Sequence, residues 1–206
     1  MMLQRSDEWF TARLGKVTAS RISEVLTISK RNTAHKRTKY MRELLCERLT
    51  GVNADRYVTR AMQRGIDLES TARIEYELRS GNIVLETGFF THPSIKMAGA
   101  SPDGLVGNDG LLEIKCPTSF THLIFLQTGT PDEKYILQMQ WQMACTGRQW
   151  CDFVSYDDNF PDNLAYRRTR ISRDDTQIAI VEREVLLFLD ELSKMELDLN
   201  AANFAA

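Results

Sequence analysis

One stretch of the chain, residues 101–117 (SPDGLVGNDGLLEIKCP), limits most strongly what the protein can fold into. Its centre, residues 107–110 (GNDG), is typical of a tight hairpin turn, because glycine and asparagine tolerate the positive φ angles that such turns need. Residues 111–116 then predict a second strand. Side chains alternate between the two faces of a strand, so Glu113 and Lys115 share one face. The opposite face is apolar, with Leu112, Ile114 and Cys116.

A hairpin at this turn brings Asp103 back beside Glu113 and Lys115. Two carboxylates and one ammonium group are costly to bury for structure alone. They suit the binding of a divalent cation and the activation of a water molecule. Lys115 can steer that water, help to deprotonate it, or neutralise charge on an attacked phosphate. A solvent-exposed hairpin with an ordinary ion pair explains the same spacing, and the spacing alone does not decide between the two.

Hydrophobic periodicity and turn residues predict an α/β fold in which helices flank a central mixed β-sheet. The predicted helices cover residues 6–14, 22–26, 39–50, 59–80, 131–146 and 175–198. The predicted strands cover residues 83–86, 89–91, 96–100, 149–155 and 164–171, in addition to the hairpin. Residues 29–38 are polar and basic and predict a mobile loop.

A chain of 206 residues is expected to form a single domain. We expect an N-terminal helical part (1–58), a catalytic core (59–171) and a C-terminal helix (172–206). No apolar run approaches the roughly 20 residues that a membrane-spanning helix needs. The first residues lack the apolar core of a signal peptide, so a cytoplasmic protein is expected. The cysteines form no CxxC pair and are expected to be reduced thiols: Cys46, Cys116, Cys145 and Cys151.

Charge is distributed unevenly along the chain. The net charge is only −2, but residues 30–42 carry six basic side chains and no acidic one, whereas the stretch from Asp174 onward is rich in acids. Such an asymmetry is what binding to a polyanion on one face requires. A merely solvated basic loop explains residues 30–42 equally well.

Five blocks of the sequence resemble, in order and spacing, those of the lambda exonuclease or YqaJ-type viral recombinase family. This family lies within the PD-(D/E)xK nuclease superfamily, which shares a restriction-endonuclease-like core. The blocks are residues 13–20 (RLGKVTAS), 64–73 (RGIDLESTAR), 101–105 (SPDGL), 112–117 (LEIKCP) and 135–143 (YILQMQWQM).

The resemblance implies roles for individual residues of the catalytic centre. Asp103 and Glu113 match the two metal-binding carboxylates, and the backbone carbonyl of Ile114 matches a further ligand. The remaining matches are Lys115 with the catalytic lysine, Glu69 with a glutamate that supports a second metal ion, and Gln138 with a glutamine that positions the water or the phosphate. From the residues alone, Glu69 and Gln138 are ordinary polar side chains of two predicted helices.

The resemblance also implies a pocket for a terminal 5′-phosphate, formed by Arg13, Ser20 and Ser101. A guanidinium group and hydroxyls suit a dianionic phosphate. The family's best-known member completes this pocket with an arginine shortly after the K-C-P block. Residues 118–122 (TSFTH) contain no arginine here, so Ser119, His122 or a residue from elsewhere in the chain is the candidate replacement.

Other side chains occupy positions where this family admits and splays the duplex. Trp9, Arg60 and Met62 are expected at the entrance, although Trp9 and Met62 also suit the core. Lys36 and Arg37 belong to a basic segment, residues 30–39, which we expect at a DNA channel. The histidines show no metal-ligand spacing and are expected to be ordinary surface or turn residues: His35, His92 and His122.

By resemblance, the protein is expected to be a Mg²⁺-dependent 5′→3′ exonuclease of double-stranded DNA, with Mn²⁺ able to substitute. It would degrade one strand to mononucleotides and leave a 3′ overhang for a single-strand annealing protein in homologous recombination. A ring-shaped homotrimer around the duplex is implied as well. The alternatives are an iron–sulfur recombination nuclease, which the cysteine spacing disfavours, and a non-catalytic scaffold that binds DNA ends, which the presence of Asp103, Glu113 and Lys115 disfavours.

Overall fold

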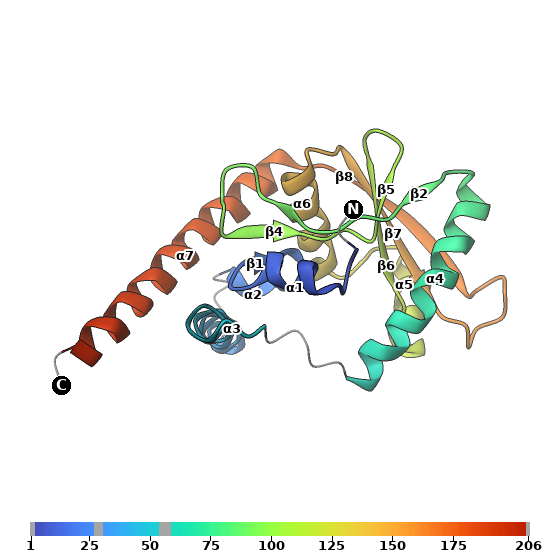
Figure 1. Ribbon diagram of the computed structural model, residues 1–206. Helices are drawn as coiled ribbons and strands as arrows, with labels where there is room; N and C mark the ends of the chain where they lie inside the picture. The colour runs from blue at the N-terminus through green and yellow to red at the C-terminus, as the bar shows by residue number, and fades with distance from the viewer. Residues whose placement is uncertain (1–2, 27–30, 54–58, 205–206) are drawn as a thin grey trace.

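The structure is a computed structural model that describes residues 3–26, 31–53 and 59–204 (Figure 1). Its helices are α1 (Asp7–Arg13), the short 3-10 turn η1 (Ala19–Arg21), α2 (Ile22–Val25), α3 (Arg31–Thr50), α4 (Arg60–Ser80), α5 (Ser119–Thr128), α6 (Glu133–Thr146) and α7 (Asp175–Phe204). Its strands are β1 (Val17–Thr18), β2 (Val84–Leu85), β3 (Phe90–Thr91), β4 (Ala98–Ala100), β5 (Gly104–Val106), β6 (Gly110–Lys115), β7 (Trp150–Tyr156) and β8 (Tyr166–Ser172).

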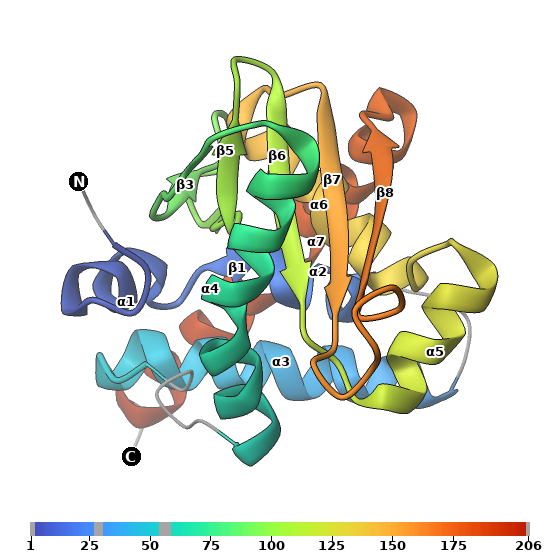
Figure 2. The same ribbon diagram turned by 90° about the vertical axis from the view of Figure 1, so that its right-hand side faces the viewer.

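The main sheet has the strand order β2-β5-β6-β7-β8. The pair β6 and β7 is parallel, whereas the other neighbours are antiparallel, so the sheet is mixed. A smaller sheet has the order β1-β4-β3. Since helices cover both faces of the main sheet, the predicted α/β fold with a flanked mixed sheet is confirmed (Figure 2).

Each face of β6 belongs to a different apolar cluster. On one face, Leu112 and Ile114 pack with Ala72 and Tyr76 of α4. On the other face, Leu111 packs with side chains of α5, α6 and β7, namely Phe125, Met139, Met143, Cys151 and Phe153. A third cluster joins the N-terminal helices to β4, α6 and α7. This two-sided burial holds β6, which carries Glu113 and Lys115, at the centre of the molecule.

Capping residues fix the helix boundaries that the sequence predicts. The Ser6 hydroxyl accepts a hydrogen bond from the Trp9 amide of α1 at 3.2 Å, and the Asp132 carboxylate accepts one from the Lys134 amide of α6 at 3.0 Å. Helices α4 and α6 end at Gly81 and Gly147, whose φ angles of 69° and 73° are left-handed. The predicted ends of these helices are confirmed.

One prediction about local structure was wrong, and one helix was missed. The mobile loop expected over residues 29–38 is replaced by the first turns of α3, which begins at Arg31, while residues 29 and 30 lie outside the described part. Arg37 stabilises this part of α3 because it donates hydrogen bonds to the Val25 carbonyl and to Glu191 of α7. Helix α5 was not predicted, since the uncharged residues 118–130 show no clear helical period.

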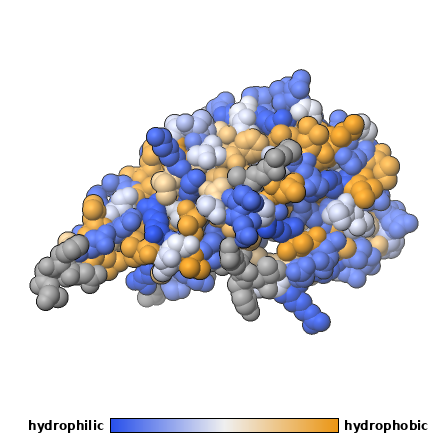
Figure 3. Space-filling view, viewed as in Figure 1, coloured by the Kyte–Doolittle hydropathy of each residue, from blue (hydrophilic) through white to orange (hydrophobic). Residues whose placement is uncertain are grey.

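Hydrophilic and apolar residues are mixed over the face of the molecule that Figure 3 shows. Helix α7 extends beyond the rest of the chain toward the C-terminus (Figure 1). None of the helices in the described residues is both long and apolar enough to cross a membrane.

Candidate active site

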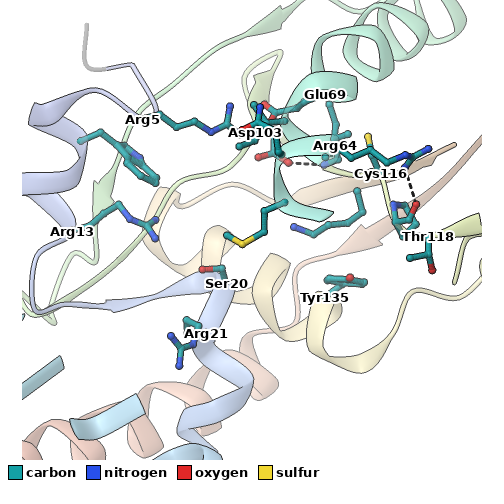
Figure 4. A pocket seen from close by; sticks show the side chains of 18 of the residues that line it. Arg5, Arg13, Ser20, Arg21, Arg64, Glu69, Asp103, Cys116, Thr118 and Tyr135 are labelled. Carbon is teal, nitrogen blue, oxygen red and sulfur yellow. Dashed lines mark hydrogen bonds and ion pairs between the residues drawn. The ribbon is translucent and has the colours of Figure 1, made fainter. Parts of the chain in front are cut away.

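A cavity of about 1040 Å³ opens where the N-terminal elements face α4 and the end of β6 (Figure 4). Its wall includes Trp9 and Arg13 of α1, the first turns of α4 and the segment from Ile114 to Ser119. Asp103 and Lys115 line it as well, and Figure 4 shows Asp103 next to Glu69 and Arg5. The charged residues of the hairpin therefore face a space large enough for a nucleotide-sized ligand.

The hairpin brings Asp103 beside β6, as the sequence predicts. Strand β5 pairs with β6 in a register that places Gly104 opposite Leu112. The Asp103 amide donates to the Leu112 carbonyl at 3.1 Å, and the Asp103 Oδ2 atom accepts a hydrogen bond from the Ile114 amide at 2.7 Å. These backbone contacts fix the carboxylate of Asp103 beside the end of β6.

Glu113 is completely buried between the sheet and α6. Its Oε1 atom accepts a hydrogen bond from the Gln138 Nε2 atom at 2.6 Å and forms an ion pair with the Lys115 ammonium. Its Oε2 atom accepts a hydrogen bond from the Gln142 Nε2 atom at 2.6 Å. A buried carboxylate needs such donors, and here two amides and one ammonium group supply them.

The charges at this centre influence one another strongly. Burial raises the pKa of Asp103 well above its usual range, and the negative charges of Glu113 and Glu69 raise this pKa further. For Lys115, burial opposes the charged form, but the carboxylates of Glu113 and Asp103 outweigh it and raise the pKa of the ammonium. The centre therefore concentrates negative charge around a single lysine.

The donor chemistry fits a divalent metal ion. Asp103, Glu113 and the Ile114 carbonyl offer oxygen atoms, which Mg²⁺ and Mn²⁺ prefer, and a cation would relieve the repulsion that raises the pKa of Asp103. In the described residues no three acidic, histidine or cysteine side chains converge on one point. Glu69 instead accepts hydrogen bonds from Arg5 at 2.8 Å and Arg73 at 3.0 Å.

The residues predicted for a 5′-phosphate lie on one wall of the cavity or just behind it. Arg13 and Ser20 line the cavity, and the Arg13 guanidinium lies 4.0 Å from the centre of the Trp9 ring. Ser101 is not among the lining residues, but its hydroxyl accepts a hydrogen bond from the Trp9 indole nitrogen at 2.8 Å. Figure 4 shows Arg13 and Ser20 on the side of the cavity opposite Arg64 and Thr118.

The structure decides between the residues that were candidates to replace the missing arginine of the phosphate pocket. His122 is completely buried, and its ring nitrogens hydrogen-bond to the Ser155 hydroxyl at 2.7 Å and the Leu164 carbonyl at 2.8 Å. It is a core residue and cannot complete a phosphate pocket. Ser119 does line the cavity. Further basic side chains that sequence reasoning missed line it too: Arg5, Arg21 and Arg64.

Only some of the residues predicted to contact DNA line the cavity. Trp9 is only 8% exposed and Met62 is 51% exposed, and both line the cavity. Arg60 and Lys36 are exposed but do not line it. Arg37 is engaged by Glu191, with nitrogen–oxygen distances of 2.6 and 2.8 Å. Lys30, also placed in the basic segment, lies outside the described residues.

His92 lies in the turn after β3, as expected, but it is buried, and His122 is a buried residue of α5 rather than a surface or turn residue. Each ring has hydrogen-bond partners on both of its nitrogens. The cysteines lie on α3, after β6, on α6 and on β7, all as free thiols, and no cluster that could hold a metal forms among the described residues. Burial raises the pKa of Cys116, which lines the cavity, to about 12.

Comparison with known sequences identifies the family. The sequence model of the YqaJ-like viral recombinase domain matches residues 8–149, which include nearly all of α1, the hairpin and α6. The chain belongs to this family. A search of curated proteins gave no significant match.

Solved structures agree with this family membership. An alkaline exonuclease (LHK-Exo) from Laribacter hongkongensis is 53% identical over 97% of this chain and 100% of its own, with a TM-score of 0.88. The same enzyme in complex with dAMP is also 53% identical over 98% and 100% of the two chains, with a TM-score of 0.91. A phage-related exonuclease from Haemophilus somnus 129PT is 15% identical over 89% and 96%, with a TM-score of 0.71, and shares the fold.

The family and the fold agree with the geometry of the site. This YqaJ-family chain is a nuclease with the restriction-endonuclease-like α/β core that the sequence predicted. One contact at the candidate site was not foreseen, since Gln142 lies at the end of the helix block and its bond to Glu113 depends on how α6 packs on β6.

Proposed function

We propose that the protein is a Mg²⁺-dependent 5′→3′ exonuclease that degrades one strand of double-stranded DNA from its end to mononucleotides. The observation that carries this proposal is the cavity, which Asp103, Lys115, Arg13 and Ser20 all line. A cation-binding centre and a phosphate-binding wall in one space suit a strand end better than the middle of a duplex. The dAMP bound to the Laribacter enzyme, a nucleoside monophosphate, supports a mononucleotide product.

In this proposal the chain's own residues divide the chemistry among them. Asp103, Glu113 and the Ile114 carbonyl would hold one Mg²⁺ ion, with Glu69 for a second, and a bound ion stabilises charge on the attacked phosphate and lowers the pKa of water. Lys115 adds positive charge close to the reacting phosphate. Gln138 keeps the Glu113 carboxylate in position and orients the attacking water or the phosphate.

The direction of digestion follows from the phosphate wall. If Arg13, Ser20 and Ser101 hold the terminal 5′-phosphate, the next phosphate along the strand reaches the carboxylates. Hydrolysis there releases a 5′-mononucleotide and leaves a new 5′-phosphate for the next cycle. The 3′ overhang that remains would serve a single-strand annealing protein in homologous recombination, and a cytoplasmic place of action is part of the same proposal.

We also propose a ring-shaped homotrimer that surrounds the duplex. Supporting observations come from α5, where Phe120, Leu123 and Ile124 recur at helical spacing and are 73%, 41% and 45% exposed. Exposed apolar side chains on one helical face are typical of a protein interface. A second copy of the chain is the occupant that we propose for this face.

The test is digestion of linear duplex DNA in Mg²⁺ by the wild-type protein and the Lys115→Ala variant. We expect the wild type to release acid-soluble nucleotides and the variant to be slower by at least about a hundredfold, the scale expected for losing a major electrostatic contribution. Equal release by both proteins would exclude the catalytic assignment, and DNA binding without any release would favour a scaffold instead.

The same assay with differently labelled ends tests the direction. Release of a 5′-terminal label before a 3′-terminal label is expected, and 5′-phosphoryl ends should be digested faster than 5′-hydroxyl ends. Equal rates on the two kinds of 5′ end would remove Arg13, Ser20 and Ser101 from the proposed phosphate pocket.

A further inference from the structure

The amide of Gln142 is bonded in an unusual way for a core residue. Gln142 is completely buried on α6, and its Nε2 atom donates to the Glu113 Oε2 atom at 2.6 Å. Its own Oε1 atom is buried without a hydrogen-bond partner among the described residues. A buried oxygen without a donor destabilises the fold, so this position carries a cost that an apolar side chain would avoid.

The neighbouring glutamine on the same helix provides a comparison. Gln140 is also buried, but its Nε2 atom donates to the Ser172 carbonyl at 2.8 Å and its Oε1 atom accepts from the Asp174 amide at 2.9 Å. Both ends of the Gln140 amide are therefore satisfied by backbone groups. Gln140 ties the start of α7 to α6 and has no bond to Glu113.

Glu113 explains why the Gln142 amide tolerates its unpaired oxygen. An ionised carboxylate offers no proton, so only the Nε2 end of an amide can face it. The opposite orientation would direct the Gln142 oxygen at the Glu113 oxygen and would repel it. Met139 and Met143, which follow Gln138 and Gln142 along α6, are fully buried in an apolar cluster, so packing alone gives no reason for an amide here.

Gln138 and Gln142 lie one helical turn apart, four residues, on the face of α6 that meets β6. Each donates to a different oxygen of Glu113, which fixes the plane of the carboxylate. The Lys115 ammonium and the Gln138 amide both contact the Glu113 Oε1 atom, whereas the Gln142 amide donates to the Glu113 Oε2 atom. Without Gln142, the carboxylate could rotate about its Cγ–Cδ bond.

We infer that Gln142 is a positioning residue that orients Glu113 for binding a divalent metal ion. This inference rests on the proposed function, because it assigns Gln142 to the support of a carboxylate that holds the metal. Residues that hydrogen-bond to metal ligands keep those ligands in place, and their loss typically weakens metal binding or activity about 10- to 100-fold.

The experiment compares Gln142→Met with the matched control Gln140→Met. Methionine has nearly the length of glutamine but no donor. The first readout is binding of Mn²⁺ to the DNA-free protein by titration calorimetry, and the second is the midpoint of thermal unfolding. We expect Gln142→Met to weaken Mn²⁺ binding about tenfold or more, and Gln140→Met to lower the unfolding midpoint while Mn²⁺ binding stays as in the wild type.

The outcomes separate the inference from the proposed function. If Gln142→Met binds Mn²⁺ as tightly as the wild type, or if Gln140→Met weakens binding equally, Gln142 is only a structural residue. If Gln142→Met fails to fold, Gln142→Asn takes its place, since its shorter amide keeps the polarity but cannot reach Glu113 in the same way. A wild type that digests DNA and binds Mn²⁺ retains the proposed function whatever the variants do, and one that does neither overturns both.

Discussion

At the proposed catalytic centre, two neighbouring carboxylates differ in how firmly they are held. Glu113 has donors at both oxygens from α6 and Lys115. Asp103 accepts a hydrogen bond from the Ile114 amide, and burial together with the charges of Glu113 and Glu69 raises its pKa. The negative charge of Asp103 is therefore stabilised by fewer hydrogen-bond donors than that of Glu113. Keeping this charge lowers the stability of the folded protein.

The Asp103→Asn substitution is expected to stabilise the protein and inactivate it. Asparagine keeps an oxygen for the Ile114 amide but removes a charge that burial and two nearby carboxylates disfavour. We expect a higher urea midpoint and nucleotide release slower by at least about a hundredfold. Asp109→Asn, in the exposed turn of the same hairpin, is the control and should change neither quantity. An unchanged or lower urea midpoint for Asp103→Asn would contradict this account.

The arrangement of the charged residues on the β5–β6 hairpin could be predicted because their geometry is local. The turn sets the register, and the register brings Asp103 to Glu113 within a dozen residues of chain. Gln142, Arg5 and Arg64 could not be predicted, since their partners lie far along the sequence and meet them only after α6, α4 and the N-terminus have packed. Glu69 was predicted from its sequence block, but its bonds to Arg5 and Arg73 were not.

Among the secondary-structure elements, those with capping residues were predicted best. Helices α1, α4 and α6 begin after Ser6, Thr59 and Asp132, and each of these side chains accepts a bond from the helix backbone. Helix α5 has no such side-chain bond at Thr118, and the start of α3 depends on contacts of Arg37 with α7. Tertiary contacts therefore determine α5 and the start of α3, which the local sequence pattern did not predict.

His92 connects the end of β3 to α7. Its Nδ1 atom accepts hydrogen bonds from the amides of Ser94 and Ile95, and its Nε2 atom pairs with Glu182 at 3.1 Å. The ring also stacks on Trp141 at 4.8 Å. Burial lowers the pKa of His92, although Glu182 opposes this effect. The neutral ring is the form that the fold accommodates.

Stability is therefore expected to decline as the pH falls below about 6.5, where the unfolded chain begins to bind a proton that the folded His92 resists. The contribution is fully present above that pH, and the slope from one such group is at most about 1.4 kcal/mol per pH unit. Urea unfolding between pH 8 and pH 5 measures it. His92→Asn keeps an acceptor for the two amides but does not titrate, so this part of the slope should vanish. An identical slope in both proteins would rule out His92 as its source.

At the scale of the whole molecule, the main clusters join all parts of the chain. The cluster around Ile22, Leu44 and Trp141 also includes Phe188 and Leu192 of α7, so the N-terminal helices, α6 and the C-terminal helix stabilise one another. The division into three parts remains a prediction about function rather than a visible break in packing. The cavity lies where the first two of these parts meet.

The molar mass of the protein in solution tests whether it assembles into a trimer. We expect light scattering to give about three times the 23.6 kDa of one chain. Phe120→Glu, which puts a charge on the apolar face of α5, should shift the mass toward that of one chain. Ile180→Glu, at a 51% exposed apolar position on α7, is the control and should leave it unchanged. A wild type that is monomeric at all concentrations would exclude the trimer, and a Phe120→Glu trimer would exclude α5 as its interface.

The contacts of Trp9 have a spectroscopic consequence. The chain contains three tryptophans; Trp141 is fully buried, Trp150 lies 3.5 Å from the Arg170 guanidinium, and Trp9 alone lines the cavity. A ligand that draws Ser101 or Arg13 away from the indole of Trp9 changes the polarity around that fluorophore. Its emission should therefore shift when a DNA end enters the cavity in a chelating buffer. Trp9→Phe would remove the shift, so tryptophan fluorescence can report binding in the cavity without any hydrolysis of DNA.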